Sequence, residues 1–287
     1  MRTSSILVAV VIVTFKNAKM LKDLLEDLRK QTRAPDEIIV VDNASTDNTE
    51  NIVNAYCGEA TNYIQLKENT GSAGGYYEGI KAAIKRSDFV WTLDDDVRLE
   101  RDSLEELLNG FIKLDSFNRI GSVRSVGKRQ NDLAPYRLKF FSWRGTLIKT
   151  EYIRRFGLPM RSLFLYGEDL EYSLRFNVKG LYCYWIPSSV CTEQRETGKI
   201  DYSFLGNITR IYELPFQLYY AFRNNLYIFI RYKCFLELLH FLLYTAKCTI
   251  IILFWKGNNK AKKLSAIYMG LLDGWRRKIG KNKTYVP

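Results

Sequence analysis

Short apolar runs alternate with amphipathic stretches along the first 115 residues. The apolar runs have the length of strands and are rich in β-branched and aromatic residues; they lie at 6–14, 38–41, 63–66 and 89–93. Asn17, a residue type that caps helices, precedes leucines at helical spacing: Leu21, Leu24, Leu25 and Leu28. Strands that alternate with helices predict an α/β fold with a mostly parallel, Rossmann-like sheet covered on both faces.

The alternation weakens after residue 115. Segments 120–127 and 136–149 have the composition of strands and predict a mixed extension of the sheet. Residues 168–177 predict a helix, and residues 181–186 predict a further strand.

Charge divides the chain into two parts. Residues 1–198 contain 28 Lys+Arg and 27 Asp+Glu, whereas residues 199–287 contain 15 and 4, a net charge of +11. We therefore expect two domains, a catalytic domain at 1–198 and a basic, helical region at 199–287. A basic region favours an anionic partner, which is either nucleic acid or acidic lipid.

The basic region contains a long apolar segment, Cys234–Trp255, interrupted by Glu237, His240 and Lys247. With Tyr244, these residues recur on one helical face, and a Lys near the centre of a spanning helix costs about 2.5–3.5 kcal/mol. Lysines follow directly, at Lys256, Lys260, Lys262 and Lys263. The pattern is typical of an amphipathic helix in the membrane interface, although a core helix with a solvated basic tail would read similarly.

Five scattered cysteines have no metal-ligand spacing and predict a reducing compartment. Residues 6–13 are too short and too weakly flanked for a signal peptide and favour a buried strand.

Polar residues follow three of the predicted strands. The triplet Asp94–Asp96 comes directly after the fourth strand, and like charges this close repel one another unless a cation neutralises them. Thr14–Asn17 and Asp42–Asp47 follow the first and second strands. Because ligands bind at the carboxyl ends of parallel strands, a divalent cation with a diphosphate would fit here. A solvated acidic turn is the alternative.

Two further segments carry candidate chemistry. Asn69–Gly75 is rich in glycine and precedes a helix, where backbone could approach a phosphate closely; glycines also close ordinary tight turns. Gly167–Tyr172 is acidic, and a carboxylate there could act as a general base or merely complement the helix dipole.

Together these motifs resemble the inverting family 2 glycosyltransferases of the GT-A fold over about residues 6–195. The marks are Thr14-Phe15, Asp42-Asn43-x-Ser45-x-Asp47, Asp94–Asp96, Trp143-x-Gly145 and Gly167-Glu168-Asp169-x-Glu171. Three others resemble the branch of galactofuranosyl- and rhamnosyltransferases that build bacterial surface polysaccharides: Asn69-x-Gly71-x-x-Gly74-Gly75, Tyr219-Tyr220-x-x-Arg223-Asn224, and Asp273-Gly274 with Gly280.

The resemblance implies a role for each matched position. Asp169 would be the general base, and Trp143 and Glu168 would bind the acceptor. Asp94 and Asp96 would ligate Mn²⁺ or Mg²⁺. The donor-binding residues would be Thr14, Phe15, Asp42, Asn69, Gly71, Asp94 and Asp95. Many relatives carry a metal-binding His where this chain has Glu193, which could supply an oxygen ligand or be a surface charge.

The resemblance also implies UDP-galactofuranose or dTDP-rhamnose as donor and a glycan or lipid-linked glycan as acceptor. The long apolar run of the basic region favours an anionic membrane surface over nucleic acid, and we expect a peripheral location on the cytoplasmic face of the bacterial membrane and no nucleic acid. Two alternatives stay open, a sugar-nucleotide-forming nucleotidyltransferase and a non-catalytic membrane-surface protein. Against the nucleotidyltransferase, this chain has no basic glycine-rich loop after the first predicted strand.

Overall fold

The computed structural model describes residues 6–56, 61–115, 119–130, 132–194, 199–204, 207–254 and 258–286. The chain forms two compact units. Unit 1 contains residues 1–160 and 169–195, and unit 2 contains residues 161–168 and 196–287. The domain boundary expected at 198 lies outside the described residues and stays a prediction. Residues 161–168, assigned from sequence to the catalytic domain, group with the C-terminal unit instead.

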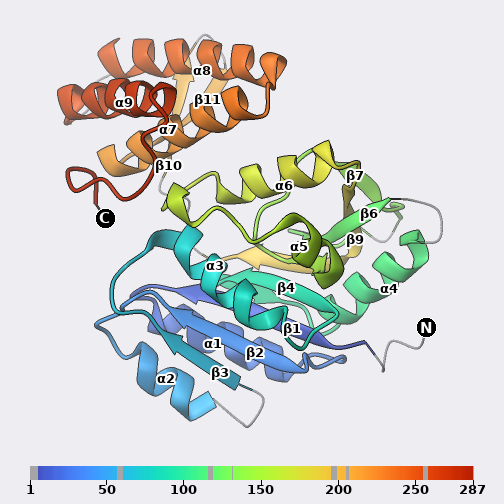
Figure 1. The fold of residues 1–287 in the computed structure, drawn as a ribbon. Coiled ribbons are helices and arrows are strands. Elements are labelled where there is room, and N and C mark those ends of the chain that lie inside the picture. The colour runs from blue at the N-terminus through green and yellow to red at the C-terminus, as the bar shows by residue number, and fades with distance from the viewer. Residues whose placement is uncertain are drawn as a thin grey trace. The chain divides into compact units, whose positions relative to one another are not determined.

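One half of the unit 1 sheet is parallel. Its strands lie in the order β3 (Thr61–Gln65), β2 (Glu37–Asp42), β1 (Val8–Thr14) and β4 (Phe89–Asp94). The helices between them are α1 (Ala18–Arg29), α2 (Thr49–Tyr56) and α3 (Gly71–Ala83). Figure 1 shows α1 and α2 on one face of this half-sheet and α3 on the other. The expected α/β fold is confirmed.

The other half of the sheet is mixed, as the weakened alternation predicts. Its strands are β5 (Val97–Leu99), β6 (Ile120–Val126), β7 (Tyr136–Leu138), β8 (Thr146–Lys149) and β9 (Tyr182–Glu193), and its helices are α4 (Ser103–Asp115), α5 (Thr150–Phe156) and α6 (Glu168–Val178). In the described part of the chain these strands extend β4 through an antiparallel β8 to β6 and β9. Segment 136–149 divides into two short strands, and β9 continues to Glu193.

The alternation of side chains along β1 builds a core on each face of the sheet. Val8, Val10 and Ile12 pack with the leucines of α1, whereas Ala9 and Val11 pack with α3. This is the two-residue period of a strand that is buried on both faces.

The C-terminal part of unit 2 contains a hairpin that was not predicted from the sequence, β10 (Lys199–Phe204) and β11 (Asn207–Tyr212). Three helices follow: α7 (Pro215–Arg231), α8 (Phe235–Phe254) and α9 (Lys260–Trp275). Gly270 and Gly274 let α9 approach α7 closely, since a Cβ on either would lie within 2.6 Å of the α7 backbone.

Helix α8 presents two different faces. Phe241 packs against Phe222 of α7 with ring centroids 5.6 Å apart, while leucines elsewhere on the helix are exposed. Among the described helices, α8 alone has the length and composition that crossing a membrane requires. Trp255, the end of the segment expected from sequence, lies outside the described residues.

Candidate active site

The three polar strand ends meet at one edge of the parallel half-sheet, as expected. Thr14 pairs with Asp42 across β1 and β2, and Val13 pairs with Asp94 across β1 and β4. The register therefore brings the motifs of residues 14–17, 42–47 and 94–96 to the carboxyl ends of neighbouring strands.

Asp95 turns toward the end of β1. Its carboxylate accepts hydrogen bonds from the hydroxyl of Thr14 (2.7 Å), the side-chain amide of Asn17 (2.9 Å) and the backbone N–H of Phe15 (3.4 Å). Burial raises the pKa of Asp95 to about 6. Asn17 stands at the start of α1 as predicted, but its side chain makes no cap bond and holds Asp95 instead.

Asp42 is buried and bonded through both oxygens. One oxygen accepts from the backbone N–H of Ser45 (2.8 Å) and the other from the hydroxyl of Tyr63 (2.6 Å). Burial, together with the Asp42 carboxylate, raises the pKa of Tyr63. Any donor contact by Asp42 would use the remaining lone pairs of these oxygens.

The glycine-rich segment closes the turn into α3 and packs that helix on the sheet. Asn69 accepts from the backbone N–H of Gly71 (2.8 Å), which has a φ of 74°, and closes the turn into α3. A Cβ on Gly75 or Gly79 would lie 2.4 or 2.5 Å from a valine of β1. Gly75 and Gly79 let α3 lie against the sheet, and the donor contacts expected of Asn69 and Gly71 stay a prediction.

Asp94 accepts a hydrogen bond from the hydroxyl of Tyr76 on α3 (2.7 Å). Burial raises the pKa of Asp94; the Arg144 charge lowers it and the Glu193 charge raises it. Trp143 stacks on Tyr76 with ring centroids 4.9 Å apart and is 3% exposed. Within the described residues, the indole N–H of Trp143 has no hydrogen-bond partner.

Asp169 lies in the first turn of α6, where the charge of Asp94 acts on it. Burial is the largest cause that raises the pKa of Asp169 to about 6, the Asp94 charge adds to it, and the Arg124 charge opposes it. A carboxyl group near this pKa can accept a proton at neutral pH. Glu168, the preceding residue, belongs to unit 2 and is buried.

Asp94 and Asp96 supply part of the ligand set that a divalent cation requires. Mg²⁺ commonly takes one or two protein carboxylates and completes its shell with substrate phosphates and water. Burial and the nearby Glu193 charge oppose ionisation of Asp94. A bound cation would favour the ionised carboxylate. Glu193 reaches this edge but forms an ion pair with Arg144. In the part of the chain that is described, no three His, Cys, Asp or Glu residues cluster for a metal.

Three residues at this edge were not predicted from the sequence to belong to the site: Tyr76, Arg124 and Arg144. Arg144 lies inside the Trp143-x-Gly145 motif, and its Glu193 partner is 49 residues away. Arg124 donates through Nε to the backbone oxygen of Arg144 (3.1 Å). Only the tertiary fold brings these cations beside the carboxylates.

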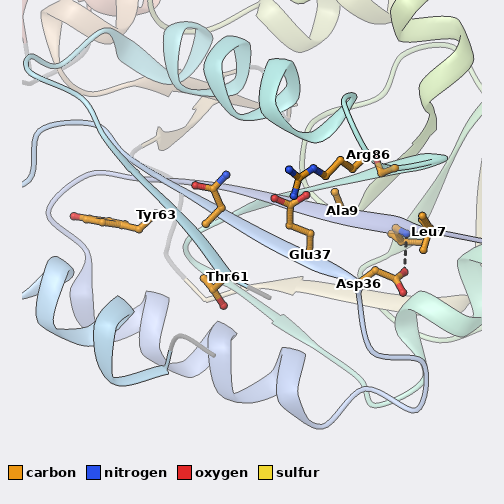
Figure 2. A pocket seen from close by; sticks show the side chains of 10 residues that line it. Leu7, Ala9, Asp36, Glu37, Thr61, Tyr63 and Arg86 are labelled. Carbon is orange, nitrogen blue, oxygen red and sulfur yellow. Dashed lines mark hydrogen bonds between the residues drawn. The ribbon is translucent and has the colours of Figure 1, made fainter. Parts of the chain in front are cut away.

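A separate cavity of about 520 Å³ lies at the opposite, amino ends of β1, β2 and β3. Figure 2 shows Glu37 and Arg86 pointing toward one another beside Thr61 and Ala9. Asp36, at its rim, accepts from the backbone N–H of Val8 (2.8 Å). None of the predicted site residues lines this cavity.

The half-parallel sheet with an acidic edge matches the GT-A fold expected from the sequence motifs. The structure of residues 1–349 of Staphylococcus aureus TarS in complex with UDP-GlcNAc has this fold, with a TM-score of 0.62, 16% identity, and coverage of 93% of this chain and 81% of that one. The model of glycosyl transferase family 2 matches residues 9–164, more than half of the chain, and the chain belongs to this family.

Two curated relatives of the chain are named as transferases of different sugars. Galactofuranosyltransferase GlfT1 of Mycolicibacterium smegmatis is 26% identical over 208 residues, 62% of this chain and 68% of that protein. O-antigen chain rhamnosyltransferase WbaN of Salmonella anatum is 36% identical over 84 residues, 29% of this chain and 26% of that protein. The predicted family and enzyme class are confirmed, and the non-catalytic alternative is set aside.

Proposed function

We propose that this enzyme transfers galactofuranose or rhamnose from UDP-galactofuranose or dTDP-rhamnose to a hydroxyl of a glycan or lipid-linked glycan, with inversion in a single displacement. The names of the two relatives support these sugars, and the UDP-GlcNAc complex of TarS supports a nucleotide-sugar donor. The observation that carries the proposal is the acidic edge of the sheet, where the strand register brings Thr14, Asp42 and Asp94 together and where the Asp94 charge acts on Asp169 at the start of α6.

The two carboxylates have different tasks in this proposal. Asp169 takes the proton of the acceptor hydroxyl as its oxygen attacks the anomeric carbon, and the nucleoside diphosphate leaves from the opposite side. Asp94 and Asp96 would hold Mn²⁺ or Mg²⁺, which when bound supplies positive charge for the departing diphosphate. Because Glu193 is paired with Arg144, we give it no ligand role unless that ion pair opens.

The donor and acceptor are assigned to different residues. The donor nucleotide lies at the carboxyl ends of β1, β2 and β4, against the residues Thr14, Phe15, Asp42, Asn69, Gly71 and Asp95. Thr14 and Asp95 already bond to each other, so we infer that they shape the donor site as a pair. On the acceptor side, the indole N–H of Trp143 would donate to a sugar hydroxyl, because a buried donor without a partner is costly.

We propose that unit 2 associates peripherally with an anionic membrane surface on the cytoplasmic face. The exposed apolar residues of α8 support this role: Phe235, Leu236, Leu239, Leu243, Leu253 and Phe254, the last of them 82% exposed. Lysines and arginines of the same region supply the charge complementarity. A surface of this kind suits an acceptor that is itself lipid-linked.

A nucleotide-sugar screen tests the proposed function. Purified enzyme with Mn²⁺ is offered UDP-galactofuranose, dTDP-rhamnose and UDP-GlcNAc, each with a lipid-linked glycan acceptor, and glycan product is measured by mass spectrometry. We expect product from one of the first two donors and none after chelation with EDTA. Product from UDP-GlcNAc alone would overturn the sugar assignment, and undiminished transfer in EDTA would overturn the metal assignment.

A further inference from the structure

The loop that leads into α6 has an unusual backbone. Phe164, Tyr166 and Gly167 have φ values of 65°, 61° and 86°, in the left-handed region that residues with side chains rarely adopt. Such a conformation persists only where the surroundings over-determine it. The loop and the contacts described below lie within unit 2, so their geometry is internal to one compact body.

Asn224 of α7 supplies the main contacts. Asn224 is fully buried, and its Nδ2 lies within hydrogen-bond distance of three carbonyl oxygens of the loop, those of Leu163 (3.0 Å), Leu165 (2.7 Å) and Tyr166 (2.6 Å), which share its two N–H hydrogens. One amide thereby holds the backbone on both sides of Phe164 and up to the residue before Gly167.

Arg223, the preceding residue, fixes the direction of that amide. Its Nε donates to Oδ1 of Asn224 (2.8 Å), so the amide nitrogen must face the loop. A second guanidinium nitrogen donates to the carbonyl of Leu163 (2.8 Å), and the guanidinium lies 4.7 Å from the ring centre of Tyr220. The charge is 1% exposed and is met by carbonyl dipoles and aromatic faces.

The loop lies close against α7 at its last residue. A Cβ on Gly167 would lie 3.2 Å from Ile228 and 3.3 Å from Asn224, and the φ of 86° disfavours any side chain there. Contact with α7 therefore continues to the residue before Glu168.

We propose that Arg223 and Asn224 form a carbonyl clamp, a positioning pair that holds loop 163–167 so that α6 presents Glu168 and Asp169 to the acceptor. This inference rests on the proposed function. Glu168 belongs to the same unit as the clamp and Asp169 is the next residue, so a displaced loop moves both through the backbone. The C-terminal unit then contributes to catalysis as well as to membrane association.

The clamp is tested with Asn224→Ala, and Tyr219→Phe is the matched control. Tyr219 lies on the same helix, and its buried hydroxyl donates to Asp273 (2.7 Å) and accepts from Asn282 (2.9 Å), neither of which belongs to loop 163–167. Both variants lose buried hydrogen bonds of α7, and only Asn224→Ala releases the loop. Gly167→Ala disturbs the same loop from the other side and replaces Asn224→Ala if that variant does not fold.

The readouts are hydrogen exchange of peptides covering 161–168 and steady-state transfer, normalised to donor-binding sites. For Asn224→Ala we expect at least about tenfold faster exchange in that segment, a turnover lowered about 10²-fold, as misplaced catalytic groups cause, and a raised acceptor KM. Donor KM should stay within about twofold. Tyr219→Phe should leave the exchange of 161–168 and both kinetic constants near wild type.

The clamp is rejected if 161–168 exchanges at the wild-type rate in Asn224→Ala and in Gly167→Ala. A loss of turnover shared equally by Tyr219→Phe would also reject it, because the effect would then be general to α7. If the wild-type enzyme transfers no sugar, the proposed function fails, and the exchange comparison still decides whether the clamp holds the loop.

Discussion

Replacing Asp169 with Asn tests the proposed general base. The change keeps the size of the side chain and an oxygen that can accept from the backbone N–H of Leu170 (2.7 Å), and it removes the proton acceptor. Burial raises the pKa of Asp169 to about 6, so at pH 7 about nine-tenths of the wild-type carboxyl groups are ionised and basic. General base catalysis contributes roughly 10²–10⁴-fold, which corresponds to about 2.7–5.5 kcal/mol in activation free energy.

The assay is turnover at saturating acceptor and donor, with donor KM measured alongside. We expect turnover of Asp169→Asn to fall in that range with donor KM nearly unchanged, because the donor is assigned to residues on other elements. Glu168→Gln is the paired control, and it should raise acceptor KM more than it lowers turnover. If Asp169→Asn keeps near-wild-type turnover while Glu168→Gln collapses, the base is Glu168 and the assignment is wrong.

Three further predictions concern pH, packing and the membrane. The kcat/KM for the acceptor should fall about tenfold from pH 7 to pH 5, because a base of pKa about 6 loses its charge there, and a flat profile would contradict the raised pKa. Gly79→Ala places a methyl 2.5 Å from Val11 and should cost about 1–3 kcal/mol of unfolding free energy in urea titration; an unchanged midpoint would contradict the close packing. Leu239→Gln with Leu243→Gln should weaken binding to anionic liposomes, which wild type should lose at high salt, and binding indifferent to lipid charge would reject the membrane role.

The register of a parallel sheet explains how far sequence alone could predict the site. Apolar runs located the strands to within a few residues, and parallel strands end at a common edge, so Thr14, Asp42 and Asp94 had to meet. The hydrogen-bond and ion-pair partners of each side chain could not be predicted from this register. The pairing of Glu193 with Arg144 depends on β9 continuing past the expected end of its strand, which no local pattern revealed.

Glycines illustrate a second limit of sequence reading. The glycines of Asn69–Gly75 could let backbone approach a phosphate or close a tight turn, and Gly75 lets α3 pack against β1. Both readings need a missing Cβ, and only the neighbouring element decides between them. The hairpin β10–β11 was not foreseen either, although Ile200, Tyr202 and Phe204 alternate with polar residues along β10.

The central claim is that Asp94 and Asp96 serve the donor and its metal, whereas Asp169 serves the acceptor. This assignment is tested most directly by calorimetric titration of UDP and dTDP into wild-type, Asp96→Ala and Asp169→Asn enzyme, with and without Mn²⁺. We expect wild type and Asp169→Asn to bind one nucleotide with equal affinity in Mn²⁺, and Asp96→Ala to lose the Mn²⁺-dependent part of that affinity. Wild-type affinity in Asp96→Ala, or lost affinity in Asp169→Asn, would contradict the assignment of donor and acceptor to these two groups.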